Sequence, residues 1–190
     1  MSSPIPDPSS CEEVVCATTC DQPLPATEWS LCNPEVNFGE IDAIFTTNIG
    51  NPLTNENDPS EWAGRKAMNI ANAARIDEFH VIAEKPAAES SEIKISRDIT
   101  VVGQKTHTIT GEISQTNNTN YNAMRQYECG KKILFWYRTA GGKLYGGATG
   151  IEGSLIINHV IPKSRKELSV FAFTLKWEAQ YHPCVTDSVI

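Results

Sequence analysis

Hydrophobic and polar residues alternate with a period of two over much of the second half of the chain. Segment 105–114 places His107, Ile109 and Ile113 on one side and threonines on the other. Segment 170–178 alternates in the same way, and its apolar side consists of Phe171, Phe173, Leu175 and Trp177. Strict alternation is typical of an antiparallel strand with one buried face. Both segments are therefore predicted to be strands packed on a core.

Segment 133–137 is apolar on both sides. Ile133, Phe135 and Tyr137 point one way, and Leu134 and Trp136 point the other. A strand of this kind needs a cover on its second face, either a helix or another subunit. The helix predicted at about 119–129 is a candidate cover. Together with the apolar side of segment 170–178, these five residues are candidates for a hydrophobic core or a subunit interface.

The remaining pattern predicts short strands and one further helix. Strands are expected at 41–47, 79–83, 93–99 and 150–155, with a loop at 86–91. A helix is expected to begin after Asp58, because Asp58 can cap it, Pro59 suits its first position and Glu61 stands three residues after the cap. This helix is predicted to run to about residue 74.

Strands outnumber helices in this pattern, and the connections between them are short. The expected fold is mainly β, an antiparallel β-sandwich or curled barrel with one or two short helices, over residues 38–190. Residues 1–37 are rich in proline, serine, threonine and aspartate and show no useful periodicity. They are predicted to form an extended arm that is too polar to fold alone.

The charge balance limits the possible partners. The net charge is −7 and the isoelectric point is near 5.1, which argues against a surface that grips nucleic acid through its phosphates. No stretch is apolar over the roughly 18 to 20 residues that span a bilayer, so no membrane partner is expected. The first residues lack the basic and apolar regions of a secretory signal. The chain is therefore expected to be made in the cytoplasm.

Four of the six cysteines lie in the arm, at Cys11, Cys16, Cys20 and Cys32. Their spacing does not match the tight paired hooks of zinc sites. Disulfides formed in an oxidising medium and free structural thiols both remain open, because pairing cannot be read from sequence.

No catalytic constellation is visible. The histidines are scattered, and His107 alternates with apolar residues as a strand histidine does. The glycines of segment 146–150 lack the strand-turn-helix setting of a phosphate loop and are predicted to lie in hairpins and bulges. We expect no active site, no metal and no cofactor.

The order of elements between Lys105 and Pro183 resembles the tail tube proteins of long-tailed bacteriophages, whose fold recurs in ring proteins of phage tails and contractile injection machines. The matching segments are 109–114, 120–130, 133–138, 150–155 and 167–177. Segment 136–147 is similar to phage proteins of gut Bacteroidota. The cysteine-rich arm departs from the usual tail tube N-terminus, which leaves open a repeating tube subunit or a single specialised ring.

The resemblance implies a virion structural protein, made in the host cytoplasm, that assembles into a ring with other phage tail or head proteins. The ring would be a homo-oligomer, a hexamer or a multiple of it, and genomic DNA would pass through its lumen without specific binding. Two alternatives remain. One is a capsid decoration protein that clamps its neighbours with the arm. The other is a carbohydrate-binding module with stacking faces from Trp29, Trp62, Trp136 and Tyr145.

Overall fold

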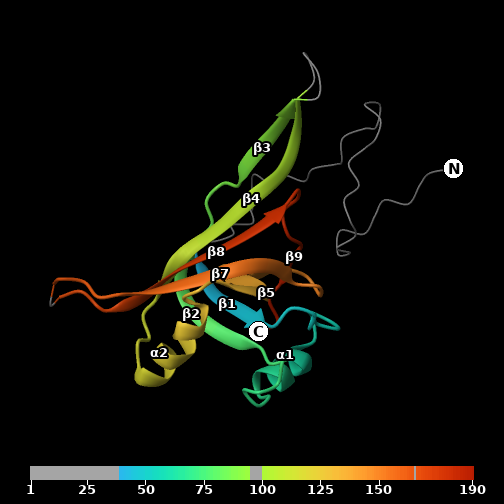
Figure 1. The fold of residues 1–190 in the computed structure, drawn as a ribbon. Helices are drawn as coiled ribbons and strands as arrows, with labels where there is room; N and C mark the ends of the chain where they lie inside the picture. Colours follow the sequence, from blue (N-terminus) through green and yellow to red (C-terminus); the bar gives the residue numbers. More distant parts are fainter. Residues whose placement is uncertain (1–38, 95–99, 165) are drawn as a thin grey trace, which may run out of the picture.

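Six antiparallel strands close into a barrel in the computed structural model, which describes residues 39–94, 100–164 and 166–190 (Figure 1). In order around the barrel the strands are β1 (Ile41–Thr47), β2 (Asp77–Glu84), β4 (Thr100–Ile113), β8 (Val170–Ala179), β7 (Ile151–Val160) and β5 (Lys131–Thr139). Pairing of β5 with β1 closes the ring of strands. The mainly β fold predicted from the sequence is confirmed. The predicted arm lies outside the described residues.

The closing seam joins two distant parts of the chain. Ile44 pairs with Tyr137 at its centre. Near one end, Arg138 donates two hydrogen bonds to the carboxylate of Asp42, at 2.8 and 3.1 Å, across 96 positions of sequence. The same guanidinium donates to the backbone oxygen of Ile190 at 2.7 Å. The seam is thus held by backbone pairing and by a charge-assisted contact, the stronger kind of hydrogen bond.

Three further strands extend this sheet. β3 (Glu89–Lys94) pairs with the first half of β4, and the two form a ribbon that leaves the barrel (Figure 1). β6 (Lys143–Tyr145) pairs with the end of β5, and β9 (Val185–Asp187) pairs with β6. The sequence predicted a loop where β3 begins, and the rest of the predicted strand at 95–99 lies outside the described residues. β6 and β9 were not predicted, because three residues are too few to display alternation.

Helix α1 (Pro59–Lys66) begins as predicted. The Asp58 side chain accepts a hydrogen bond from the backbone N–H of Ser60 at 2.9 Å, and Pro59 occupies the first turn. The predicted end near residue 74 is wrong. Beyond Lys66, the side chains of Asn69 and Asn72 accept hydrogen bonds from backbone N–H groups two residues later. Such local bonds favour turns over continued helix.

The second helix, α2 (Asn118–Met124), is followed by a 3₁₀ turn, η1 (Arg125–Tyr127). Met124 of α2 and Tyr127 of η1 pack against the barrel core. The α2 helix does not cover the outer face of β5, although the sequence made a helix at about 119–129 the candidate for that role.

The barrel interior contains the main hydrophobic core. The inward side chains of β5 and β8 meet there: Ile133, Phe135, Tyr137, Phe171, Phe173, Leu175 and Trp177. The Trp177 ring stacks on His107 with centroids 4.9 Å apart and meets the Phe135 ring edge-on at 5.4 Å. Alternation in the sequence therefore identified the inner face of both strands correctly.

A second hydrophobic cluster lies outside the barrel, under α1. It combines Leu134 and Trp136 of β5 with Phe45 of β1 and Trp62 of α1. Trp62 meets Phe45 edge-on at 5.2 Å and Trp136 at 5.5 Å. The apolar outer face of β5 is thus covered within the chain by α1, a helix far from β5 in the sequence.

Trp136 packs tightly against a glycine-rich turn. Its indole Nε1 donates to the backbone oxygen of Gly147 at 2.6 Å. A Cβ placed on Gly146 would lie 2.5 Å from Cδ1 of Trp136, and a Cβ on Gly150 would lie 2.8 Å from Cζ2. Both glycines also have positive φ, of 130° and 71°, which other residues rarely adopt. The glycines of segment 146–150 therefore serve packing. The segment joins β6 to β7 (Ile151–Val160), which pair with other strands and not with each other, so the hairpin predicted here does not form.

We expect Trp136→Ala to lower the free energy of unfolding by about 3 to 5 kcal/mol, because the side chain is fully buried and its neighbours cannot close the cavity. Ile70→Ala is a matched control, since Ile70 is 79% exposed, and it should change stability by less than about 0.5 kcal/mol. Denaturant unfolding of both variants gives the comparison. Equal stability of Trp136→Ala and the wild type would contradict the packing described above.

Candidate functional site

The nine residues predicted as core or subunit interface all lie inside a single chain. None of them is more than 5% exposed, and together they are Ile133, Leu134, Phe135, Trp136, Tyr137, Phe171, Phe173, Leu175 and Trp177. Side chains that are already buried leave no surface for a second subunit. Any contact between copies must therefore use other residues.

The aromatic residues considered for sugar stacking are placed differently. Trp62 and Trp136 are fully buried. Tyr145 stacks face to face on Tyr137, with centroids 4.7 Å apart. Trp29 lies outside the described residues. The three described side chains are thus engaged in packing, and the observation that suggested sugar binding loses most of its support.

The four cysteines of the predicted arm, Cys11, Cys16, Cys20 and Cys32, lie outside the described residues. Cys129 is exposed and Cys184 is partly buried, and both are free thiols. Within the part of the chain that the structure describes, no group of three or more His, Cys, Asp or Glu residues is arranged to hold a metal ion. None of the helices described is long and apolar enough to cross a bilayer.

His107 is a buried histidine of the barrel wall. Its Nε2 lies 3.3 Å from the backbone oxygen of Ala179, and its ring stacks on Trp177. Its Nδ1 is buried and has no hydrogen-bond partner among the described residues. Burial lowers the pKa of His107, the contact with the Ala179 backbone oxygen opposes this, and the nearby positive charge of Lys85 adds to the lowering. The lowered pKa favours the neutral ring, which packs on Trp177.

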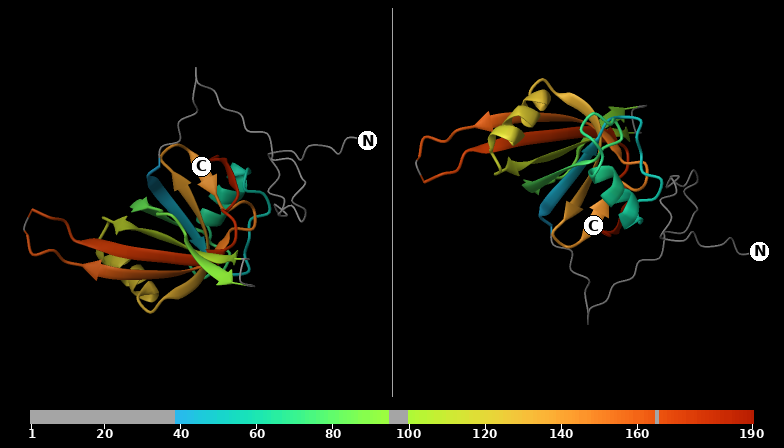
Figure 2. Two further views of the ribbon diagram at one scale, coloured as in Figure 1. Left: turned by 90° about the horizontal axis from the view of Figure 1, so that it is seen from above. Right: turned by 90° about the horizontal axis from the view of Figure 1, so that it is seen from below.

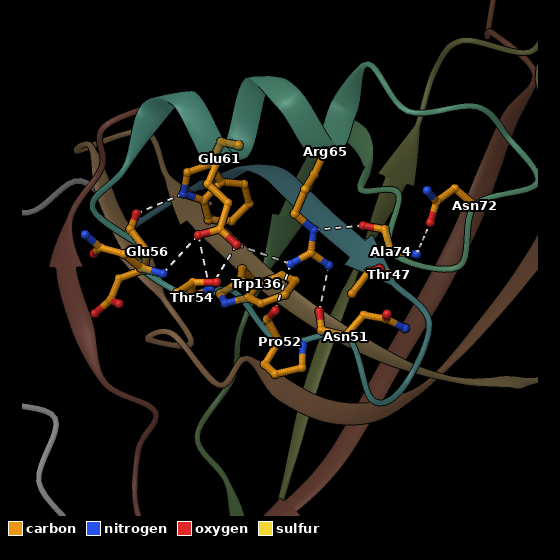
Figure 3. Close-up of polar contacts among 12 residues, drawn as sticks. Thr47, Asn51, Pro52, Thr54, Glu56, Glu61, Arg65, Asn72, Ala74 and Trp136 are labelled. Atoms are coloured by element: carbon orange, nitrogen blue, oxygen red, sulfur yellow. Dashed lines mark hydrogen bonds and ion pairs between the residues drawn. The ribbon is translucent and has the colours of Figure 1, made fainter.

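A buried arginine joins the two loops that flank α1 (Figure 3). Arg65 is 6% exposed. It donates to the backbone oxygens of Asn51 at 2.7 Å, Pro52 at 2.8 Å and Ala74 at 2.8 Å. Burial lowers the pKa of Arg65, and the charge of Glu61 partly offsets this. Arg65 thus ties the loop before α1 to the loop after it.

Glu61 and Trp62 add further hydrogen bonds between α1 and the loop before it. The Glu61 carboxylate accepts backbone N–H groups of Thr54, at 2.9 and 3.1 Å, and of Asn55, at 2.9 Å. The indole of Trp62 donates to the backbone oxygen of Glu56 at 2.8 Å. The hydrogen bonds of Glu61, Trp62 and Arg65 hold helix α1 in place over Trp136. These loop contacts were not predicted: the spacing of Glu61 and Arg65 by four positions indicates an ion pair along the helix, observed at 3.8 Å, but not the loops that both side chains reach.

The hairpin formed by β7 and β8 projects far beyond the barrel (Figures 1 and 2). Its outer part leaves three large apolar side chains uncovered: Val160 is 43% exposed, Ile161 is 74% exposed and Leu168 is 76% exposed. Lys163 and Lys166 are exposed between Ile161 and Leu168. We call residues 160–164 and 166–168 the hairpin tip. A projecting element of this composition is suited to contact with another molecule.

The base of the hairpin is fixed by aromatic contacts. His159 of β7 lies 5.2 Å from the Tyr121 ring of α2 and 5.1 Å from the Phe171 ring of β8. Its Nε2 is 2.7 Å from the hydroxyl oxygen of Ser169, across the hairpin. The direction of the hairpin is therefore set by α2 and by the bond across its two strands.

A groove lies on the outer face of β2, β4 and β8, close to where the hairpin begins. Ile82 pairs with Glu112, and Glu112 pairs with Ala172 on the next strand. The groove has a volume of about 560 Å³. Ile82 is 68% exposed, and the exposed carboxylates Glu84 and Glu112 flank it. We call Ile82, Glu84 and Glu112 the acidic groove.

No protein-family model matches this chain, and no curated protein matches it either.

We expect Arg65→Met to lower the free energy of unfolding by about 2 to 3 kcal/mol, because three backbone oxygens lose their donors. Arg65→Lys keeps the charge but cannot place three donors in one plane, so it should recover only part of the loss. Denaturant unfolding measures both. A lysine variant as stable as the wild type would show that charge alone is sufficient.

We expect stability to fall as the pH drops from about 7 to 5, in part because of His107. Its folded pKa lies below the unfolded value of about 6.5, so the unfolded state takes up a proton that the folded state does not. His107→Phe keeps a ring on Trp177 and removes this titration. Its thermal melting temperature should decline less over this range than that of the wild type. Parallel declines would contradict the assignment.

Proposed function

We propose that this chain is a virion structural protein, made in the host cytoplasm, that assembles into a ring of a phage tail, either a tail tube or a hub or connector ring. The order of elements between Lys105 and Pro183 supports this proposal by its resemblance to tail tube proteins. In this proposal the protein works by shape, without catalysis, and genomic DNA passes through the ring without specific binding.

The observation that carries the proposal is the β7–β8 hairpin. The chain covers both apolar faces of β5 with its own side chains. Yet the hairpin tip holds Ile161 and Leu168 in water, at 74% and 76% exposure. Exposed apolar groups on a projecting, fixed element are typical of protein contact surfaces. A subunit that makes its contacts through such an element is suited to assembly.

The charge of the chain suits a DNA passage. With a net charge of −7, the surface repels the phosphate backbone at long range, and repulsion keeps DNA from adhering to a wall. Strong DNA binding would instead need clustered lysine and arginine side chains.

Electron microscopy of the purified full-length protein, combined with its mass in solution, tests the proposal. We expect rings or stacked rings with a central hole, and masses at multiples of the single-chain mass. Particles without a hole that bind to capsid shells would favour the decoration protein instead. A monomer at every concentration tested would rule out the ring.

A further inference from the structure

We propose that the hairpin tip of one copy docks in the acidic groove of the next copy. This inference rests on the proposed function and supplies the contact by which the ring would form. The two surfaces belong to the same chain but to different places on it, so each copy carries one donor and one acceptor.

The donor surface combines apolar and basic groups. Ile161 and Leu168 are largely exposed, and Lys163 and Lys166 lie between them with no ion pair among the described residues. Glu167 is the one acidic residue of the tip in the sequence. The tip is therefore basic on a chain whose net charge is −7.

The acceptor surface is the chemical complement of the tip. Ile82, which lines the groove, offers an exposed apolar side chain. Glu112 pairs directly with Ile82 across the two strands, and Glu84 lies two residues further along β2 on the same outer face. Neither carboxylate has an ion pair within the described part of the chain. Two such carboxylates beside an apolar side chain favour a partner with amines and an apolar side chain of its own.

The composition of the tip favours a second copy over nucleic acid as its partner. Phosphate contacts need only positive groups, whereas Ile161 and Leu168 gain from a partner that removes apolar surface from water. The acidic groove provides Ile82 for this purpose and two carboxylates for the amines. Charge complementarity of this kind sets the orientation and the speed of association.

Contacts between two different surfaces of one chain are head-to-tail. Such contacts generate a closed ring when the rotation between neighbours closes, and an open filament when it does not. The groove lies on the sheet from which the hairpin extends, and the hairpin projects away from the barrel body (Figure 2). The tip is thus presented outward to a neighbouring copy.

The test uses two charge-reversed forms of the full-length protein. The tip variant carries Lys163→Glu and Lys166→Glu, and the groove variant carries Glu84→Lys and Glu112→Lys. Each form alone brings like charges together, so its self-association should weaken by about tenfold or more. Analytical ultracentrifugation measures this. Mixing the two forms restores both charge combinations, acidic tip with basic groove and basic tip with acidic groove. The mixture should therefore assemble like the wild type.

A control pair places the same changes elsewhere. Lys94→Glu with Glu128→Lys alters two exposed residues that belong to neither surface, and it should leave self-association unchanged. All of the substituted side chains that the test requires are exposed, and circular dichroism checks that each variant is folded. The mixing experiment is a second safeguard, because a misfolded variant cannot restore assembly.

The outcomes separate this inference from the proposed function. Wild-type rings that both variants still form would overturn the docking contact and leave the ring proposal standing. Variant-sensitive dimers or open chains without a hole would support the contact and count against the ring. A monomeric wild type would overturn both. Loss of binding to a duplex DNA oligonucleotide in the tip variant, with unchanged self-association, would overturn the docking contact in favour of nucleic acid.

Discussion

Strand β5 has to bury two apolar faces at once, and the rest of the structure follows from this requirement. Its inner face, with Phe135 at 0% exposure, needs a closed barrel around it. Its outer face, with Trp136 also at 0%, needs a lid that a sheet cannot supply. Helix α1 forms that lid through Trp62, and Arg65 fixes the loops on either side of the helix. The glycines beside Trp136 complete the enclosure because a side chain there would collide with the indole.

A core that is complete within one chain changes where contacts between chains can form. The most apolar strand of the sequence is unavailable to a partner, although its two-sided pattern left a covering subunit open. What remains for a partner is the periphery: the hairpin tip, with Leu168 exposed, and the outer face of the sheet around Ile82. These surfaces mix apolar and charged groups, as surfaces of subunits that must also persist alone in water often do.

The sequence predicted the strands well because their alternation reflects burial directly, as Phe171 to Trp177 illustrates. A helix covers β5, which is one of the two alternatives that the sequence left open. The candidate helix at about 119–129 is the wrong one, because Trp62 of α1 approaches Trp136 through the fold. The early end of α1 accompanies hydrogen bonds from backbone N–H groups to the side chains of Asn69 and Asn72. The helix propensity of a single asparagine does not reveal whether such a bond will form. The three carbonyl contacts of Arg65 need two loops in position, so no local pattern contains them. The acidic groove likewise arises only when β2 and β4 are paired.

The seam between β1 and β5 can form only late in the synthesis of the chain. Asp42 and Arg138 are 96 positions apart, so β1 leaves the ribosome long before the strand that it must pair with. Until β5 emerges, Ile44 has no closed barrel around it, and Phe45 lacks Trp136, the β5 side chain of its own cluster. Contacts between distant segments form slowly because the intervening chain must first be brought together. The hairpin tip is synthesised after both strands of the seam but before β8, which joins β4 to β7 in the barrel. The exposed apolar side chains of the tip therefore leave the ribosome before the barrel is able to close.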